Sequence, residues 1–248
     1  MVNSLPLPMA PAESTQTRWR GAPQVPVSTP RVPRPSTEEL VRRYVIAKRQ
    51  VVTAGFYAEI AWQHDAHVSS VTDRSFLRES AWVVLSAGMR ESIIRRRFPL
   101  LAYALHDFRP CAIEHDSLAR SAALQAFNHE RKVDAILYIA RVAYRLGTRG
   151  LRRVLERDPS SLIDSLPFMG PATSRHLAKN LGLGVVKPDR HLLRLASAAA
   201  RAHPDDLCGE IARWIDDPIA VVDLVLWRWA TLHRATCSVK RCDGLPHP

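Results

Sequence analysis

The sequence has few cysteines and no long apolar segment. Its 248 residues include four cysteines, of which only Cys237 and Cys242 lie close together. A zinc site needs about four closely spaced ligands, so we predict no zinc or other bound metal. No uninterrupted apolar run reaches the length of a transmembrane helix, and we therefore expect no membrane partner.

Acidic residues are also scarce relative to basic ones. The chain has 24 Asp and Glu against 35 Lys and Arg, which gives a formal net charge of +11. A surplus of this size favours a polyanionic partner such as nucleic acid. The hydrophobic content of 46% is enough for one sizeable core or for two smaller lobes.

Apolar and polar residues do not alternate with a period of two in any segment. Apolar residues recur instead at helical spacing, most clearly over 74–97, 130–147 and 219–233, and prolines and glycines lie at the ends of such segments. This pattern predicts an all-α protein. Ser36 opens the first expected helix with a sequence similar to a capping box.

The two ends of the chain differ from its middle. Eight of the 18 prolines fall within residues 1–35, so we predict a disordered segment there, with an organellar targeting segment as the alternative. Residues 36–236 form the predicted helical domain, and residues 237–248 an irregular tail. No apolar run fits a signal peptide, and we expect a cytoplasmic protein that acts on the bacterial nucleoid, or an organellar or nuclear one in a eukaryote.

The segment from residue 158 to residue 191 predicts two short helices joined by a tight hairpin, followed by an acidic residue that opens a third helix. Asp158 is suited to cap the first helix and Pro159 to begin it. The hairpin helices occupy 158–182, and the loop 183–191 contains Asp189. Pro167 ends the first helix, and Gly170 permits a positive φ in the turn.

A helix that begins directly after a glycine turn presents free backbone N–H groups, and its dipole favours an anion such as a DNA phosphate. We therefore expect DNA contacts from the hairpin and from nearby side chains. The expected contact residues are Phe168, Met169, Gly170, Pro171, Ala172, Thr173, Arg175, Lys187 and Arg190.

The pattern LPxxGPxT followed by VxxDxH resembles the helix-hairpin-helix (HhH-GPD) DNA glycosylase superfamily, which includes endonuclease III and the 8-oxoguanine glycosylases. The resemblance covers roughly residues 75–235. It implies a two-lobed helical fold with a central cleft, in which the last helix packs against the N-terminal helices. It also implies a monomer that binds double-stranded DNA with a damaged or modified base, flips that base out and excises it with help from Asp189. From the residues alone, Asp189 fits equally well as a helix cap.

The chain departs from the family pattern at two positions of the hairpin. Phe168 stands where many members have glycine, and Ala172 stands where bifunctional members have a lysine nucleophile. Alanine cannot form a Schiff base, so the resemblance implies a monofunctional hydrolase that leaves an abasic site. The alternatives are a DNA-binding protein without catalysis, and, less favoured, a glycosylase with lyase activity through a displaced lysine, Lys179 or Lys187.

The resemblance also places a base pocket. Its expected residues are Trp82, Gly88 and Met89 in the helix over 74–97, together with Asn128 and His129. Close helix packing is the alternative role for the small residues around Gly88, and helix capping is the alternative role for Asn128. Relatives that remove adenine carry a glutamate at the position of Trp82, and Glu79 is the second acid that we consider here. Some relatives hold an iron–sulfur cluster with four closely spaced cysteines. The four cysteines of this chain lack that spacing, so we expect no cofactor. An oxidised purine is the favoured substrate, with alkylated, deaminated and other modified bases left open.

Overall fold

The computed structural model describes residues 34–233, and all regular structure in this range is helical. The predicted all-α class is confirmed for this part of the chain. The expectations for the proline-rich segment and for the C-terminal tail fall outside it, apart from residues 34 and 35. Among the described residues, no helix is long and apolar enough to cross a membrane.

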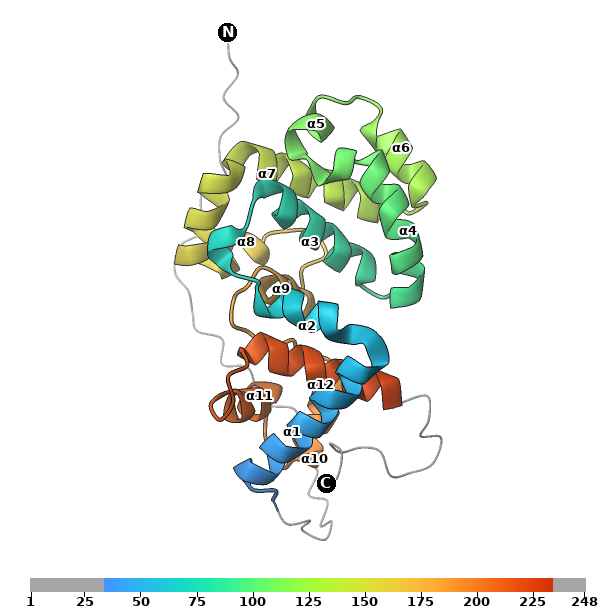
Figure 1. The fold of residues 1–248 in the computed structure, drawn as a ribbon. Coiled ribbons are helices and arrows are strands. Elements are labelled where there is room, and N and C mark those ends of the chain that lie inside the picture. Colours follow the sequence, from blue (N-terminus) through green and yellow to red (C-terminus); the bar gives the residue numbers. More distant parts are fainter. Residues whose placement is uncertain (1–33, 234–248) are drawn as a thin grey trace, which may run out of the picture. The chain divides into compact units, whose positions relative to one another are not determined.

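The α-helices follow one another along the chain with short connections (Figure 1). They are α1 (Thr37–Val51), α2 (Tyr57–His64), α3 (Asp73–Ser86), α4 (Glu91–Ala104), α5 (Pro110–Glu114), α6 (Ala119–Ala126), α7 (Glu130–Arg157), α8 (Pro159–Ile163), α9 (Pro171–Asn180), α10 (Arg190–Ala198), α11 (Pro204–Ala212) and α12 (Ile219–His233). A π-helical turn, Val52–Phe56, joins α1 to α2 at Gly55, whose φ is 90°.

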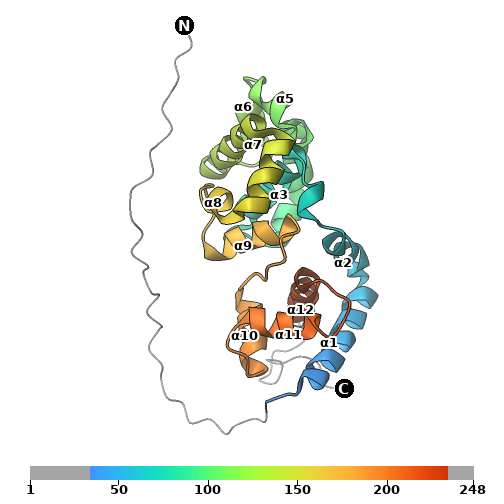
Figure 2. The same cartoon turned by 90° about the vertical axis from the view of Figure 1, so that its left-hand side faces the viewer.

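The buried apolar side chains form two separate cores. The first is built by α3 to α9, with Phe76, Ile136 and Leu177 among its fully buried members. The second combines α1 and α2 with α10, α11 and α12, and Tyr44 is its largest fully buried side chain. The N-terminal helix α1 therefore packs against the last described helix, α12 (Figure 2), as the sequence resemblance implies.

The predicted helix over 74–97 is two helices, α3 and α4. Thr72 caps α3 through a reciprocal bond with Ser75. The chain leaves α3 through a turn in which Gly88 has a φ of 73°. Buried Lys132 from α7 donates to the carbonyl oxygens of Leu85 and Ala87, each at 2.7 Å. A lysine that bonds the last free carbonyls stabilises a helix end, so Lys132 fixes the point at which α3 stops.

The hairpin has the predicted order of helix, turn and helix. Asp158 caps α8 by accepting from the backbone N–H of Ser161 at 3.1 Å. Gly170, where the sequence permits a positive φ, has a φ of −101°. The positive φ, 65°, belongs to Phe168. A side chain at this φ is strained, and Phe168 keeps the conformation because its ring packs against the first core.

Candidate functional site

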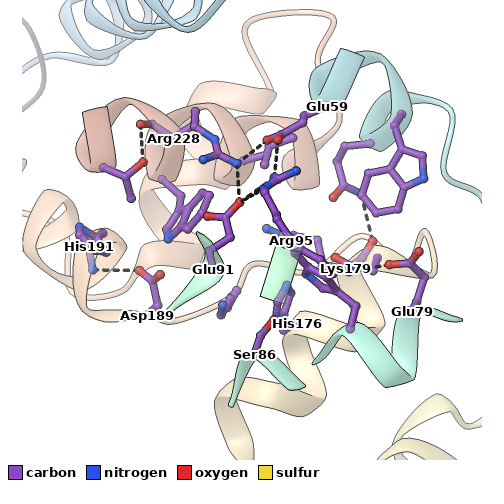
Figure 3. A pocket seen from close by; sticks show the side chains of 18 of the residues that line it. Glu59, Glu79, Ser86, Glu91, Arg95, His176, Lys179, Asp189, His191 and Arg228 are labelled. Carbon is purple, nitrogen blue, oxygen red and sulfur yellow. Dashed lines mark hydrogen bonds and ion pairs between the residues drawn. The ribbon is translucent and has the colours of Figure 1, made fainter. Parts of the chain in front are cut away.

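A pocket of about 970 Å³ opens beside Asp189, and its walls come from helices of both cores (Figure 3). Residues of α2, α3, α4, α9 and α12 line it together with the residues that begin α10. A pocket of this size holds a small ligand or a single nucleotide. Three tryptophans, Trp62, Trp82 and Trp227, supply aromatic surface in its lining.

Charged groups of both signs line the pocket, and the basic ones outnumber the acidic ones. The acidic side chains are Glu59, Glu79, Glu91 and Asp189. The basic side chains are Arg78, Arg90, Arg95, Lys179, Lys187, Arg190 and Arg228. This balance attracts an anionic ligand.

Asp189 caps α10 and also lines the pocket. One carboxylate oxygen, Oδ1, accepts the backbone N–H groups of His191 at 2.8 Å and of Leu192 at 3.1 Å. The other oxygen, Oδ2, has no hydrogen-bond partner among residues 34–233. The two roles that the sequence left open are therefore compatible, because the cap uses one oxygen and leaves the second uncommitted.

The loop before Asp189 is held by a buried ion pair. Lys179 of α9 binds Asp223 of α12, and the two side chains are 7% and 1% exposed. The second oxygen of Asp223 accepts the backbone N–H of Lys187 at 2.6 Å. Burial, reinforced by the charge of Lys179, lowers the pKa of Lys187. Lys179 is thus committed to a structural pair, whereas the amine of Lys187 lines the pocket and loses its proton more readily than an ordinary lysine.

Glu79 lies on the α3 wall, and Asn180 of α9 donates to its carboxylate at 3.0 Å (Figure 3). Burial raises the pKa of Glu79, and the hydrogen bond from Asn180 opposes this only in part. A glutamic acid with a raised pKa holds its proton more firmly than an ordinary one and is better suited to act as a general acid. The structure thus places the second acid considered from the sequence in the same pocket as Asp189.

We expect Glu79→Gln to raise the melting temperature by a few degrees at a pH of about 8 and to leave it unchanged at about pH 4. The raised pKa of Glu79 stabilises the fold while the group is protonated, and this contribution is lost as the pH rises through the folded-state pKa. Glutamine cannot ionise and still accepts the bond from Asn180. Thermal melts across the pH range, with exposed Glu156→Gln as the control, measure the difference; equal melting temperatures at both pH values would contradict it.

Four charged side chains close another part of the pocket wall. Glu59 of α2 and Glu91 of α4 each bind both Arg95 and Arg228. Burial alone would raise the pKa of Glu91, but the two arginines outweigh it and lower that pKa. The Arg228 guanidinium also lies 4.6 Å from the ring centroid of Trp227. The network joins α2, α4 and α12 and fixes the orientation of Trp227 toward the arginine.

The turn of the hairpin, residues 167–173, lies outside the pocket lining, and Gly170 and Pro171 at the start of α9 are exposed. The hydroxyl of Thr173 accepts the N–H of Gly170 at 2.7 Å and donates to the carbonyl of Phe168 at 2.8 Å. Glycine has no side chain to cap a helix, so the N–H groups of Ala172 and of Thr173 have no partner within α9. Met169, the remaining residue of the turn, is partly buried against the first core.

Arg175 is used within the protein. Its Nε donates to the carbonyl of Val186 at 2.7 Å, and its guanidinium forms an ion pair with Asp205. This arrangement connects α9 to α11. The positive charge of Arg175, which the sequence suggested for DNA contact, is paired with a carboxylate of the protein itself. Lys187 and Arg190, the other two basic residues expected to contact DNA, both line the pocket.

The expected base-pocket residues divide into two groups. Trp82 and Met89 line the pocket, whereas Gly88, Asn128 and His129 do not. Gly88 forms the turn after α3, and His129 stacks on the ring of Phe127 at the start of α7. Capping by Asn128 is also wrong, because the residue before α7 is His129 and no side chain caps the helix.

Several pocket residues were not found from the sequence, among them His176, Trp62 and the network around Arg228. Burial, with the positive charges of Lys187 and Lys179, lowers the pKa of His176 well below its usual value, so the imidazole is neutral at physiological pH. The spacing of His176, Lys179 and Asn180 puts them on one face of α9, which is a signal for a polar wall. The contributions of α2, α4 and α12 have no such local signal.

Comparison with protein-family models, with curated proteins and with solved structures found no match. Within residues 34–233, no group of three or more His, Cys, Asp or Glu side chains is placed to hold a metal ion.

Proposed function

We propose that the protein is a monofunctional DNA glycosylase with a two-lobed helix-hairpin-helix fold, which hydrolyses the bond between a damaged or modified base and its sugar. The observation that carries the proposal is Asp189, which lines a nucleotide-sized pocket with one carboxylate oxygen uncommitted. Cleavage of an N-glycosidic bond develops positive charge on the sugar, and a fixed carboxylate stabilises it.

The surroundings of Asp189 fit the other steps. The exposed start of α9 and the basic pocket side chains bind the phosphate backbone. The flipped base enters the pocket, where Trp62, Trp82 and Trp227 offer surfaces for stacking. Water adds to the anomeric carbon, and the base departs with the bonding electron pair and takes up a proton. Glu79, whose pKa is raised by burial, is the acid that we assign to this proton transfer.

A second candidate function, glycosylase with lyase activity, has one observation in its favour. Lys187 lines the pocket two residues before Asp189, and its pKa is lowered by burial and by Lys179. A lysine with a lowered pKa gives up its proton more readily and is the better nucleophile for Schiff-base chemistry. Lys179, in contrast, is held by Asp223. The absence of a lysine at Ala172 keeps hydrolysis as the first proposal.

A panel of duplexes, each with one modified base, tests the two proposed activities by measuring release of the base. Strand breaks that appear only after hot alkali are the expected result and would identify the substrate base. Strand breaks without alkali, with a borohydride-trapped adduct that Lys187→Gln abolishes, would establish the lyase. Duplex binding without any alkali-labile site across the panel would overturn excision of these bases and favour a protein that only binds DNA.

A further inference from the structure

The second half of α7 carries a dense group of positive charges. Gly147, with φ 61° and ψ 172°, interrupts the helix, and residues 148–157 continue it. This half carries four arginines, Arg149, Arg152, Arg153 and Arg157, and a single acid, Glu156. We call the four arginines the α7 arginine patch.

Three members of the patch form a row on one side of the helix. Arg149, Arg153 and Arg157 are exposed and follow one another at four-residue intervals, which spaces them by about 6 Å along the axis. Like charges at this interval repel each other and destabilise a helix. The helix dipole favours a cation in the last turn, where Arg157 lies, but this effect does not reach Arg149.

No carboxylate in the part of the chain that the structure describes neutralises the row. Arg149, Arg153 and Arg157 have no ion-pair partner among residues 34–233, whereas Arg95 and Arg120, on other helices, are paired with carboxylates. The fourth member, Arg152, donates from Nε to the carbonyl of Val71 at 2.7 Å.

The patch is hollowed and shares no residue with the pocket beside Asp189. Arg149, Arg152 and Arg153 line a shallow depression of about 560 Å³ together with Thr148 and Glu156. Thr148 bonds Asp73 at the first turn of α3, and the first pocket residue along that helix is Arg78. At about 1.5 Å per residue, the step from Asp73 to Arg78 is about 8 Å along the axis of α3.

We propose that the α7 arginine patch is a second binding surface for the phosphate backbone of duplex DNA. A guanidinium binds phosphate oxygens through two parallel hydrogen bonds. Phosphates of one strand advance by about 3.4 Å along the duplex axis and also wind around it, so their spacing in space is close to the roughly 6 Å between successive arginines of the row. The inference rests on DNA as the partner under the proposed function, but it does not depend on base excision.

The test compares two triple variants of the full chain on an undamaged fluorescent duplex of about 30 base pairs over a salt series. Each phosphate contact contributes about 0.9 to the slope of log K against log salt concentration. Arg149→Gln/Arg153→Gln/Arg157→Gln should therefore lower the magnitude of this slope by about 2 to 3. The same variant should weaken binding at least tenfold near about 0.1 M salt. The matched control, Arg42→Gln/Arg49→Gln/Arg213→Gln, removes the same charge from exposed positions on α1 and after α11 and should leave the slope unchanged.

Glu156→Gln, which removes the only acid of this segment, should tighten DNA binding. Equal slopes for the two triple variants would overturn the inference and leave DNA binding by the protein intact. Unchanged DNA binding with lost binding to phosphatidylserine vesicles would also overturn it, in favour of a membrane surface. If the wild-type protein itself does not bind the duplex, the proposed function and this inference both fail. Melting curves confirm that each variant is folded.

Discussion

We expect Asp189→Asn to lower the single-turnover rate of base release by about 10²- to 10³-fold while the affinity for the duplex stays the same. The amide has the size of the carboxylate but carries no charge, so it cannot stabilise the positive charge that develops on the sugar. It does preserve the helix cap, because asparagine and aspartate are equally good N-cap residues. The bonds to His191 and Leu192 therefore persist in the variant.

Asp158→Asn is the matched control. Asp158 caps α8 in the same way, through the N–H of Ser161, but it does not line the pocket. We expect full activity in this variant. Rates for both variants come from single-turnover assays with the base identified in the duplex panel, and affinities from fluorescence anisotropy. An active Asp189→Asn protein would refute the role of Asp189, and a parallel loss in Asp158→Asn would assign the effect to helix capping.

The parts of this protein that its sequence predicts well are those governed by short-range rules. The caps Ser36 and Asp158 were placed from residue type, and the structure shows both side chains accepting helix N–H groups. The order of hairpin, loop and Asp189 is likewise local, because prolines and glycines restrict the backbone on either side of it. The class of the described fold followed from the missing period-two alternation.

The parts that the sequence did not predict depend on packing between distant segments. Glu59 and Arg228 meet at 2.5 Å although α2 and α12 are far apart in the chain, and no local pattern marks either residue as a pocket wall. Gly170 is the residue of the turn that tolerates a positive φ most easily, yet Phe168 is the one that adopts it. Here tertiary contacts outweigh backbone preference: the Phe168 ring packs on the first core and lies 6.0 Å from the guanidinium of Arg131.

We expect Asp223→Ala to lower the stability of the fold by about 3–5 kcal/mol and the melting temperature by roughly 10 °C. The change leaves the charge of Lys179, whose side chain is 7% exposed, without a counter-ion. Desolvation of an unpaired charge is the main cost. Asp134→Ala is the control, since the pair of Asp134 with Arg120 is about half exposed and contributes at most about 1 kcal/mol. Equal losses in the two variants would contradict a stabilising buried pair.

A double variant separates the two roles of Asp223. Lys179→Met/Asp223→Leu replaces the ion pair by apolar side chains and should recover most of the lost stability, because no buried charge remains. It cannot restore the bond from Asp223 to the backbone N–H of Lys187, which is 2.6 Å long and lies two residues before Asp189. We therefore expect a stable protein in which the loop is no longer fixed and base release stays slow. Recovery of both stability and activity would show that the Asp223–Lys187 bond does not position Asp189.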